Sequence, residues 1–301
     1  MKVFKSIYLF RLSAGHGLSL SFIETALFKK PFTPCGPGDV ETRGFVPPAA
    51  HMPDQIVYFS QQAILIHLKK ETKIIPSAVK EQETQKVIAA IEKAEGRKVG
   101  RKEAKDIKES VADTLKLTAF TKVAIQRAII DLKQGLVMIE ASSIGKAEDM
   151  LSVMRQALGV MNTKLVQTNN PAKEMMTAWM EDCMPTMLSL GDSCELTNPE
   201  EGGAVARCIR QEICSDEVRG HLASGKLVTK LALEWGDKIS FQLTENLEIK
   251  RIKLMDILQD QLKGADVATQ DAMFESSATL FIGELRQFIL ALIEALGGEV
   301  A

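Results

Sequence analysis

Residues 226–244 read KLVTKLALEWGDKISFQLT and predict a β-hairpin that decides the class of the fold. Two β-type runs, 226–235 and 238–244, flank a Gly-Asp pair. Such a pair favours a tight two-residue turn of the primed type, whose twist matches that of antiparallel strands. Residues 249–254 supply a candidate third strand. These runs together indicate an antiparallel sheet.

The rest of the chain predicts an α+β fold, because strands and helices do not alternate regularly as they do in β-α-β units. Further strands are predicted over residues 3–12, 63–68, 73–75, 120–131, 136–141 and 205–209. Helices are predicted over residues 19–29, 146–158 and about 266–296. The stretch 32–53 is rich in Pro and Gly, which indicates a loop without a long regular element.

Residues 77–117 predict a helical hairpin that projects from the body of the protein. The segment is rich in Lys, Glu and Ala, and EGRKVG at 95–100 breaks it into two helices. The second helix has a narrow apolar stripe formed by Ala104, Ile107, Val111 and Leu115. A stripe of this width indicates a hairpin that packs mainly on itself.

The composition is that of a globular protein. Hydrophobic residues make up 46% and charged residues 25% of the 301 residues, which excludes a disordered or collagen-like chain. The five cysteines are odd in number and lack CxxC spacing, so we expect reduced thiols in the cytoplasm. We expect no membrane or export segment, because charged residues interrupt the apolar stretches at both ends of the chain.

The charge is distributed unevenly. Residues 1–150 contain 23 Lys and Arg and 17 Asp and Glu, a net charge of +6, whereas residues 151–301 carry −8. A polarised chain can present a basic surface to nucleic acid and remain soluble. Many folded proteins have a similar asymmetry, so charge alone leaves both interpretations open.

No motif of catalysis or cofactor binding is complete. GHLASGKL at 220–227 matches a phosphate-loop pattern, but Leu227 stands where a Ser or Thr must bind magnesium. A helix-like stretch precedes it and a β-type run follows, the reverse of a phosphate loop. The four histidines are scattered. We therefore expect no cofactor, no metal and no enzymatic activity.

The turn of the helical hairpin is strongly basic. Arg97, Lys98, Arg101 and Lys102 lie within six residues. They could be a solvated turn or a set of phosphate contacts driven by counterion release. The sequence has no recognition helix, zinc finger or row of aromatic residues, so any contact with nucleic acid is expected to be independent of base sequence.

Several long stretches resemble the RdgC family of recombination-associated proteins along nearly the whole chain. They are FTPCG (32–36), GFVPP (44–48), KIIPSAVK (73–80), GLVMIEASSIGKAEDML (135–151), KLVTKLALEW (226–235), LEIKRIKL (247–254) and ALGGE (295–299). The chain departs from the family pattern in two places. Phe45 replaces a Trp, and Ile209 stands where related sequences are more basic.

The resemblance implies a cytoplasmic, nucleoid-associated protein without a membrane partner. It implies a horseshoe-shaped subunit that forms a ring-shaped homodimer around double-stranded DNA, binds single-stranded DNA more weakly, and limits the access of RecA. The corresponding domains would be a central α/β body over 1–75 and 118–170, a tip over 76–117, and a base for dimerisation over 171–301.

The resemblance and the charge pattern together select the candidate site residues. The candidate DNA contacts are Lys73, Arg97, Lys98, Arg101, Lys102, Arg210, Gln211, Lys226 and Lys230. Arg97 matches a basic tip position of the family, and Arg210 and Gln211 match a Lys-Gln pair. Lys226 and Lys230 would share one face of a strand. Phe120 matches a residue of the dimer gate, although it could also be a core aromatic.

Two other functions stay open at this stage. The chain could be a nucleotide-dependent recombination enzyme that uses the degenerate loop at 220–227. It could also be a protein-interaction scaffold that reaches recombination proteins through its acidic C-terminal half.

Overall fold

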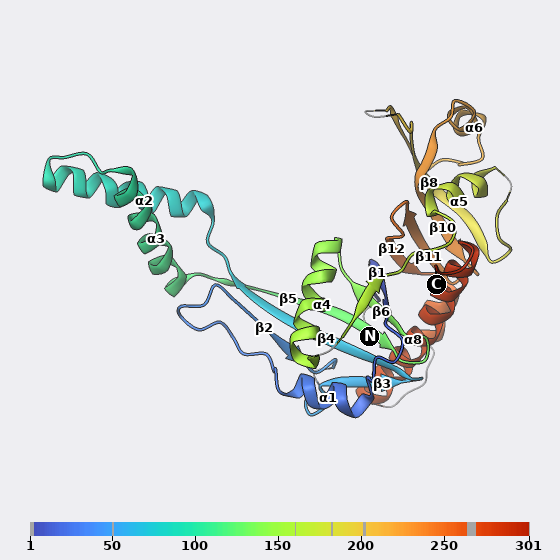
Figure 1. Ribbon diagram of the computed structural model, residues 1–301, viewed down its shortest axis with the longest axis horizontal. Coiled ribbons are helices and arrows are strands. Elements are labelled where there is room, and N and C mark those ends of the chain that lie inside the picture. Colours follow the sequence, from blue (N-terminus) through green and yellow to red (C-terminus); the bar gives the residue numbers. More distant parts are fainter. Residues whose placement is uncertain are drawn as a thin grey trace. The chain divides into compact units, whose positions relative to one another are not determined.

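The fold is α+β, as predicted. The computed structural model describes residues 3–49, 51–159, 161–181, 183–200, 203–263 and 269–300. In these residues eight helices accompany a 12-stranded antiparallel open sheet (Figure 1). The strand order is β2-β4-β5-β6-β1-β12-β11-β10-β8-β9; in addition, β3 pairs with β4 and β7 with β1.

The strands are β1 (Ile7–Leu12), β2 (Glu41–Val46), β3 (Val57–Ser60), β4 (Ala63–Lys73), β5 (Thr121–Asp131), β6 (Leu136–Glu140), β7 (Thr163–Leu165), β8 (Leu188–Thr197), β9 (Val205–Ile209), β10 (Leu227–Trp235), β11 (Ile239–Thr244) and β12 (Ile249–Leu254). The helices are α1 (Leu20–Phe28), α2 (Ser77–Glu95), α3 (Arg101–Thr118), α4 (Ile144–Leu158), α5 (Ala172–Met180), α6 (Asp216–Ala223), α7 (Asp256–Lys263) and α8 (Gln270–Ala295).

The chain forms two compact units. Unit 1 comprises Met1–Leu27, Pro47–Ile66 and Arg127–Ala301, and unit 2 comprises Phe28–Val46 and His67–Gln126. Strands β4 and β5 each run from one unit into the other. This division differs from the three parts expected from the sequence, because the helical hairpin belongs with strand β2 and with the adjoining ends of β4 and β5.

Helix α8 closes the core of unit 1. The ring of Phe288 lies 5.8 Å from the ring of Trp235 on β10 and 4.7 Å from that of Phe241 on β11. By length and composition α8 could cross a membrane, but Phe281, Leu285 and the other residues of its apolar face are buried in unit 1. In this structure the apolar residues of α8 pack against the sheet.

The predicted β-hairpin is confirmed. Strands β10 and β11 pair from Lys230 with Thr244 to Trp235 with Ile239. Gly236 and Asp237 both have φ of 53°, the left-handed conformation that a type I′ turn needs at both central positions. Strand β12 is the expected third strand and pairs with β11.

The Pro- and Gly-rich stretch 32–53 contains a strand that the sequence did not predict. Strand β2 pairs with β4 along its whole length, from Glu41 with Thr72 to Val46 with His67. A Cβ atom at Gly44 would lie 2.3 Å from the backbone of Phe32, so only glycine permits this close approach. The pairing with β4, together with the close backbone approach that Gly44 permits, outweighs the Pro and Gly content that predicted a loop.

The helical hairpin of unit 2 is confirmed as helices α2 and α3. Helix α2 ends at Gly96, whose φ of 65° is the left-handed conformation typical of a C-terminal cap. In α2 and α3 together, Thr84 and Val111 are the buried residues. Side chains of the predicted stripe line a hollow of about 280 Å³ between the helices. The hairpin therefore has little core of its own.

The C-terminal helix predicted from about residue 266 begins at Gln270. Its N-cap is Thr269, whose hydroxyl accepts a hydrogen bond from the backbone N–H of Ala272. The residues 264–268 lie outside the described part of the chain.

Candidate nucleic-acid interface

The basic turn of the helical hairpin is largely neutralised by its own carboxylates. Arg97 donates through both terminal nitrogens to Glu103, at 2.7 Å each, and through Nε to Glu95 at 2.6 Å. Lys98 pairs with Glu92 at 3.0 Å. The hydrogen bonds from Arg97 lower the pKa of the Glu103 carboxyl below its usual range. A phosphate would therefore compete with a carboxylate for Arg97 and Lys98.

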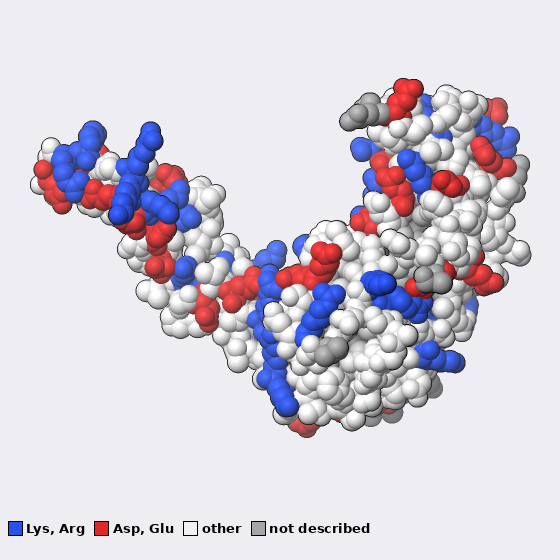
Figure 2. Space-filling view, in the orientation of Figure 1, with Lys and Arg blue, Asp and Glu red and all other residues white. Residues whose placement is uncertain are grey.

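Two cations of the turn remain available. Arg101 and Lys102 are exposed at the start of α3, and neither makes an ion pair with the residues that the structure describes. Figure 2 shows Lys and Arg intermixed with Asp and Glu over the visible face of the hairpin. The segment 77–118 holds ten Lys and Arg and eight Asp and Glu. Arg101 and Lys102 are thus the cations of the turn that could bind a phosphate without first breaking an ion pair.

Lys73 is a structural residue in this fold. Its side chain is buried, and its ammonium donates to the carbonyl oxygens of Gly36, Pro37 and Lys116 at 2.7–2.8 Å. An ammonium has three N–H groups, and all three are engaged here. The expected phosphate contact at Lys73 is therefore replaced by a link between the loop before β2 and the end of α3.

Phe120 is exposed, which excludes the alternative of a core aromatic within the chain. Its side chain is 86% exposed, and its carbonyl oxygen accepts a hydrogen bond from the N–H of Ile74. Leu117, Val123 and Ile125 next to it in the chain are also exposed. Ile74, whose N–H pairs with Phe120, is exposed as well, and we call these five residues the exposed apolar residues of unit 2.

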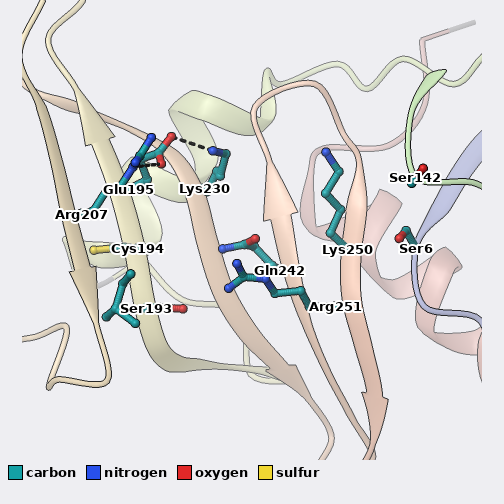
Figure 3. Close-up of a pocket in the computed structure, with 11 residues that line it drawn as sticks. Ser6, Ser142, Ser193, Cys194, Glu195, Arg207, Lys230, Gln242, Lys250 and Arg251 are labelled. Atoms are coloured by element: carbon teal, nitrogen blue, oxygen red, sulfur yellow. Dashed lines mark hydrogen bonds and ion pairs between the residues drawn. The ribbon is translucent and has the colours of Figure 1, made fainter. Parts of the chain in front are cut away.

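The face of strands β8 to β12 that lies opposite α8 is hollowed and lined by polar side chains. Two adjoining cavities of about 570 Å³ each share Ser193, Ile209, Gln242 and Arg251. We call this surface the sheet groove (Figure 3). Its cationic side chains are Arg207, Arg210, Lys230, Lys250, Arg251 and Lys253. Its acidic side chains are Asp192, Glu195 and Glu234.

A β-bulge in β12 gives the sheet groove two neighbouring cations. The register shifts between the pairs Ser240–Lys253 and Gln242–Lys250, so β12 has one residue more than β11 over this step. Ile249 and Ile252 are both buried while Arg251 is exposed. Without the extra residue, strict alternation would turn Arg251 toward the core. The stretch LEIKRIKL carries this signal, because its apolar residues are spaced by two, three and two.

Glu195 neutralises the other side of the sheet groove. It accepts hydrogen bonds from Arg207 at 2.7 Å and from Lys230 at 2.8 Å (Figure 3). Burial raises the pKa of Glu195, but the hydrogen bonds from the two cations outweigh it, and the pKa lies below its usual value. This ion pairing therefore stabilises the fold above the ordinary pKa of about 4.3 and is lost as the pH falls through the lower folded value.

If the sheet groove binds duplex DNA, Glu195→Gln is expected to raise the affinity about threefold to tenfold at low salt. The change removes one negative charge from the sheet groove and frees Arg207 and Lys230 for phosphate. The slope of log binding constant against log salt concentration, which we call the salt slope, should therefore steepen by about one. Fluorescence anisotropy across a salt series measures both quantities. Glu148→Gln, at an exposed position of α4, is the matched control. An affinity that does not change would show that the sheet groove does not face DNA.

Arg210 and Gln211 follow β9 and differ in their surroundings. Arg210 is exposed in the sheet groove with φ of 57°, and no partner for it exists among the described residues. The side-chain nitrogen of Gln211 is buried and has no hydrogen-bond partner in the described part of the chain. Arg210 is thus placed to meet a ligand, whereas the Gln211 donor would first have to turn outward.

Lys226 and Lys230 do not share a strand face, which corrects the sequence-based prediction. Lys226 lies before β10, and its ammonium is 3.0 Å from Nδ1 of His221. The register of β10 shifts between Val228 and Lys230, and Val228 and Thr229 are both buried. This irregularity reverses the alternation, so Lys230 faces the sheet groove and Lys226 does not line it.

The loop at 220–227 lacks the context of a phosphate loop. Its first four residues are the end of helix α6 and Leu227 begins strand β10, so a helix comes before a strand, as the sequence predicts. Gly225 has φ of 81° and ends the helical stretch. Over the ranges that the structure describes, no group of three or more His, Cys, Asp or Glu side chains could hold a metal ion.

Comparison with known proteins identifies the family. A family model described as "Putative exonuclease, RdgC" matches residues 3–299. A recombination-associated protein RdgC of Laribacter hongkongensis is 39% identical over 298 residues, and those of Aeromonas hydrophila and Psychromonas ingrahamii are 36% and 35% identical. Each alignment covers 98% of both chains. The chain therefore belongs to the RdgC family of recombination-associated proteins.

Proposed function

We propose that this protein binds duplex DNA without regard to sequence and acts in recombination. The observation that carries the proposal is the set of unpaired cations in the sheet groove, Arg210, Arg251 and Lys253. None of them has a carboxylate partner within the described residues. Cations of this kind can bind phosphates of any duplex, since the sugar–phosphate backbone carries no direct sequence information. The relatives named for recombination agree with a role at DNA.

We further propose that two copies form a ring-shaped homodimer that limits the access of RecA to DNA. The exposed apolar residues of unit 2 support self-association, because several large apolar side chains exposed within one short part of the fold are typical of protein–protein contacts. Phe120 has the greatest exposed fraction among the large hydrophobic residues of the described chain. A second copy that covered these residues would remove them from water.

The salt dependence of binding tests the proposal. Two duplexes of unrelated sequence are expected to bind with affinities within about twofold of each other, and six to ten phosphate contacts would weaken both by about 10³–10⁵ between 50 and 200 mM salt. Fluorescence anisotropy with labelled duplexes measures this. The double variant Arg101→Ala, Lys102→Ala should lower the salt slope by about two. Equal affinity at low and high salt, or strong preference for one duplex, would contradict the proposal.

The description of the family model suggests exonuclease activity as a second candidate. The relatives are instead named for their association with recombination. Incubation of end-labelled linear DNA with the protein and Mg²⁺ or Mn²⁺ separates the two functions. Shortening of the labelled strand would favour the nuclease, and intact DNA in a retained complex would favour the binding protein.

A further inference from the structure

Three polar side chains without partners converge in the sheet groove. Arg251 comes from β12, Gln242 from β11 and Ser193 from β8, and all three line both cavities. Figure 3 shows the guanidinium of Arg251 beside the amide of Gln242, with the Ser193 hydroxyl directed toward the same space. In the described part of the chain, none of the three side chains has a hydrogen bond or ion pair. Their free donors therefore face an open cavity.

The backbone at Arg251 is strained, and its conformation directs the guanidinium into the sheet groove. Its φ of 53° lies in the left-handed region, which is unfavourable for a residue with a Cβ atom. The bulge at this position turns the guanidinium into the sheet groove. Glycine would adopt this conformation without strain, so the arginine is held there at a cost in stability. Strained positions of this kind are concentrated at functional sites.

The floor of the sheet groove leaves room for a ligand. Gly191 and Ala232 lie beneath the cavity that also contains Ser193, and a Cβ atom at Gly191 would come within 2.9 Å of the Ala232 methyl group. Small residues at both positions thus create the hollow between the polar walls. Its volume of about 570 Å³ is larger than a phosphodiester group needs.

We propose that Arg251, Gln242 and Ser193 form a phosphate-binding subsite. A guanidinium offers a planar pair of N–H donors that matches two oxygens of a phosphate, and the amide and hydroxyl add donors to the remaining oxygens. Arg210 and Lys253 add positive charge to the same cavity, against Asp192 and Glu234. The subsite rests on the proposed function when the phosphate belongs to DNA, although a free phosphate has the same chemistry.

Two substitutions at Arg251 distinguish the contribution of the guanidinium to binding from the effect of the strained backbone. Arg251→Gly keeps the left-handed backbone and removes the guanidinium. We expect its duplex affinity to fall about tenfold and its salt slope to fall by about one, with a melting temperature no lower than that of the unchanged protein. Arg251→Lys should keep the slope and bind about threefold more weakly, because an ammonium lacks the planar pair of donors.

Arg219→Ala is the matched control, since Arg219 is exposed on α6, outside the sheet groove. It should leave the salt slope within half a unit of the unchanged value. If the unchanged protein binds DNA in a salt-dependent way and Arg251→Gly binds identically, DNA is excluded as the ligand of the subsite while the proposed function stands. If the unchanged protein shows no salt-dependent binding of DNA, the proposed function fails. Binding of the small phosphate compounds described next then tests the subsite.

Titration with the dinucleotide d(TpT) and with inorganic phosphate, followed by NMR, distinguishes the two sources of phosphate. Chemical shift changes near residues 240–254 that are lost in Arg251→Gly support the subsite. The probe that binds more tightly then identifies its ligand as a phosphodiester or a free phosphate. Absence of Arg251-dependent binding of both probes, together with an unchanged salt slope, overturns the proposal.

Discussion

Arg286→Ala is expected to lower the free energy of unfolding by about 3–5 kcal/mol. Arg286 on α8 pairs through Nε with Asp131, whose side chain is 1% exposed, at 2.5 Å. It also donates to the carbonyl oxygen of Gln61 at 2.6 Å. Removing the guanidinium leaves a buried carboxylate without its countercharge, which costs more than the pair itself contributes. Urea denaturation of the whole protein measures the change.

The double variant Asp131→Asn, Arg286→Met provides a sharper test of the same pair. It removes both charges and should lose less stability than Arg286→Ala alone, since no unpaired charge remains buried. Arg219→Ala, an exposed arginine, should change the free energy of unfolding by less than about 0.5 kcal/mol. A loss below about 1 kcal/mol in Arg286→Ala would mean that water reaches Asp131 and replaces the ion pair.

Lys73→Met is expected to destabilise unit 2 by about 3 kcal/mol. The substitution keeps the apolar stem and removes the ammonium that binds three carbonyl oxygens, two in the loop before β2 and that of Lys116 in the last turn of α3. The positive charge also interacts favourably with the C-terminal end of that helix. Amide hydrogen exchange should show faster exchange in the last turn of α3, with unit 1 unchanged.

The matched control for Lys73 is Lys122→Met, at an exposed position of β5. It should leave exchange in α3 unaltered. If Lys73→Met instead keeps its exchange pattern and binds DNA more weakly, the lysine contacts DNA as its place in the sequence suggested. The two readouts therefore separate a structural role from a phosphate contact.

The elements that could be predicted from the sequence are those whose signals are local. The Gly-Asp turn at 236–237 and the EGRKVG break at 95–100 fix their hairpins without help from the rest of the chain. Strand β8 gives no such signal, because Gly191 and Asp192 interrupt its sequence LSLGDSCELT. It forms because β9 and β10 pair with it on both sides. A pattern within one segment does not reveal such partners.

The candidate site was harder to predict, since charge in a sequence does not show which charges are already paired. Arg97 and Lys98 lie in a basic turn, yet the fold of that turn brings Glu95, Glu103 and Glu92 to them. The bulge in β12 was the one site feature with a local signal. The two cations between Ile249 and Ile252 exclude strict alternation, and they would have identified Arg251.

The small buried area of the helical hairpin has a consequence for how this protein can change during evolution. Helices gain most of their stability from tertiary packing, and α2 and α3 place few side chains out of water. Substitutions on their outer faces therefore change the surface potential with little penalty to folding. The hairpin is thus the segment in which selection can adjust net charge most freely, whereas the tightly packed sheet over α8 constrains almost every inward-facing position.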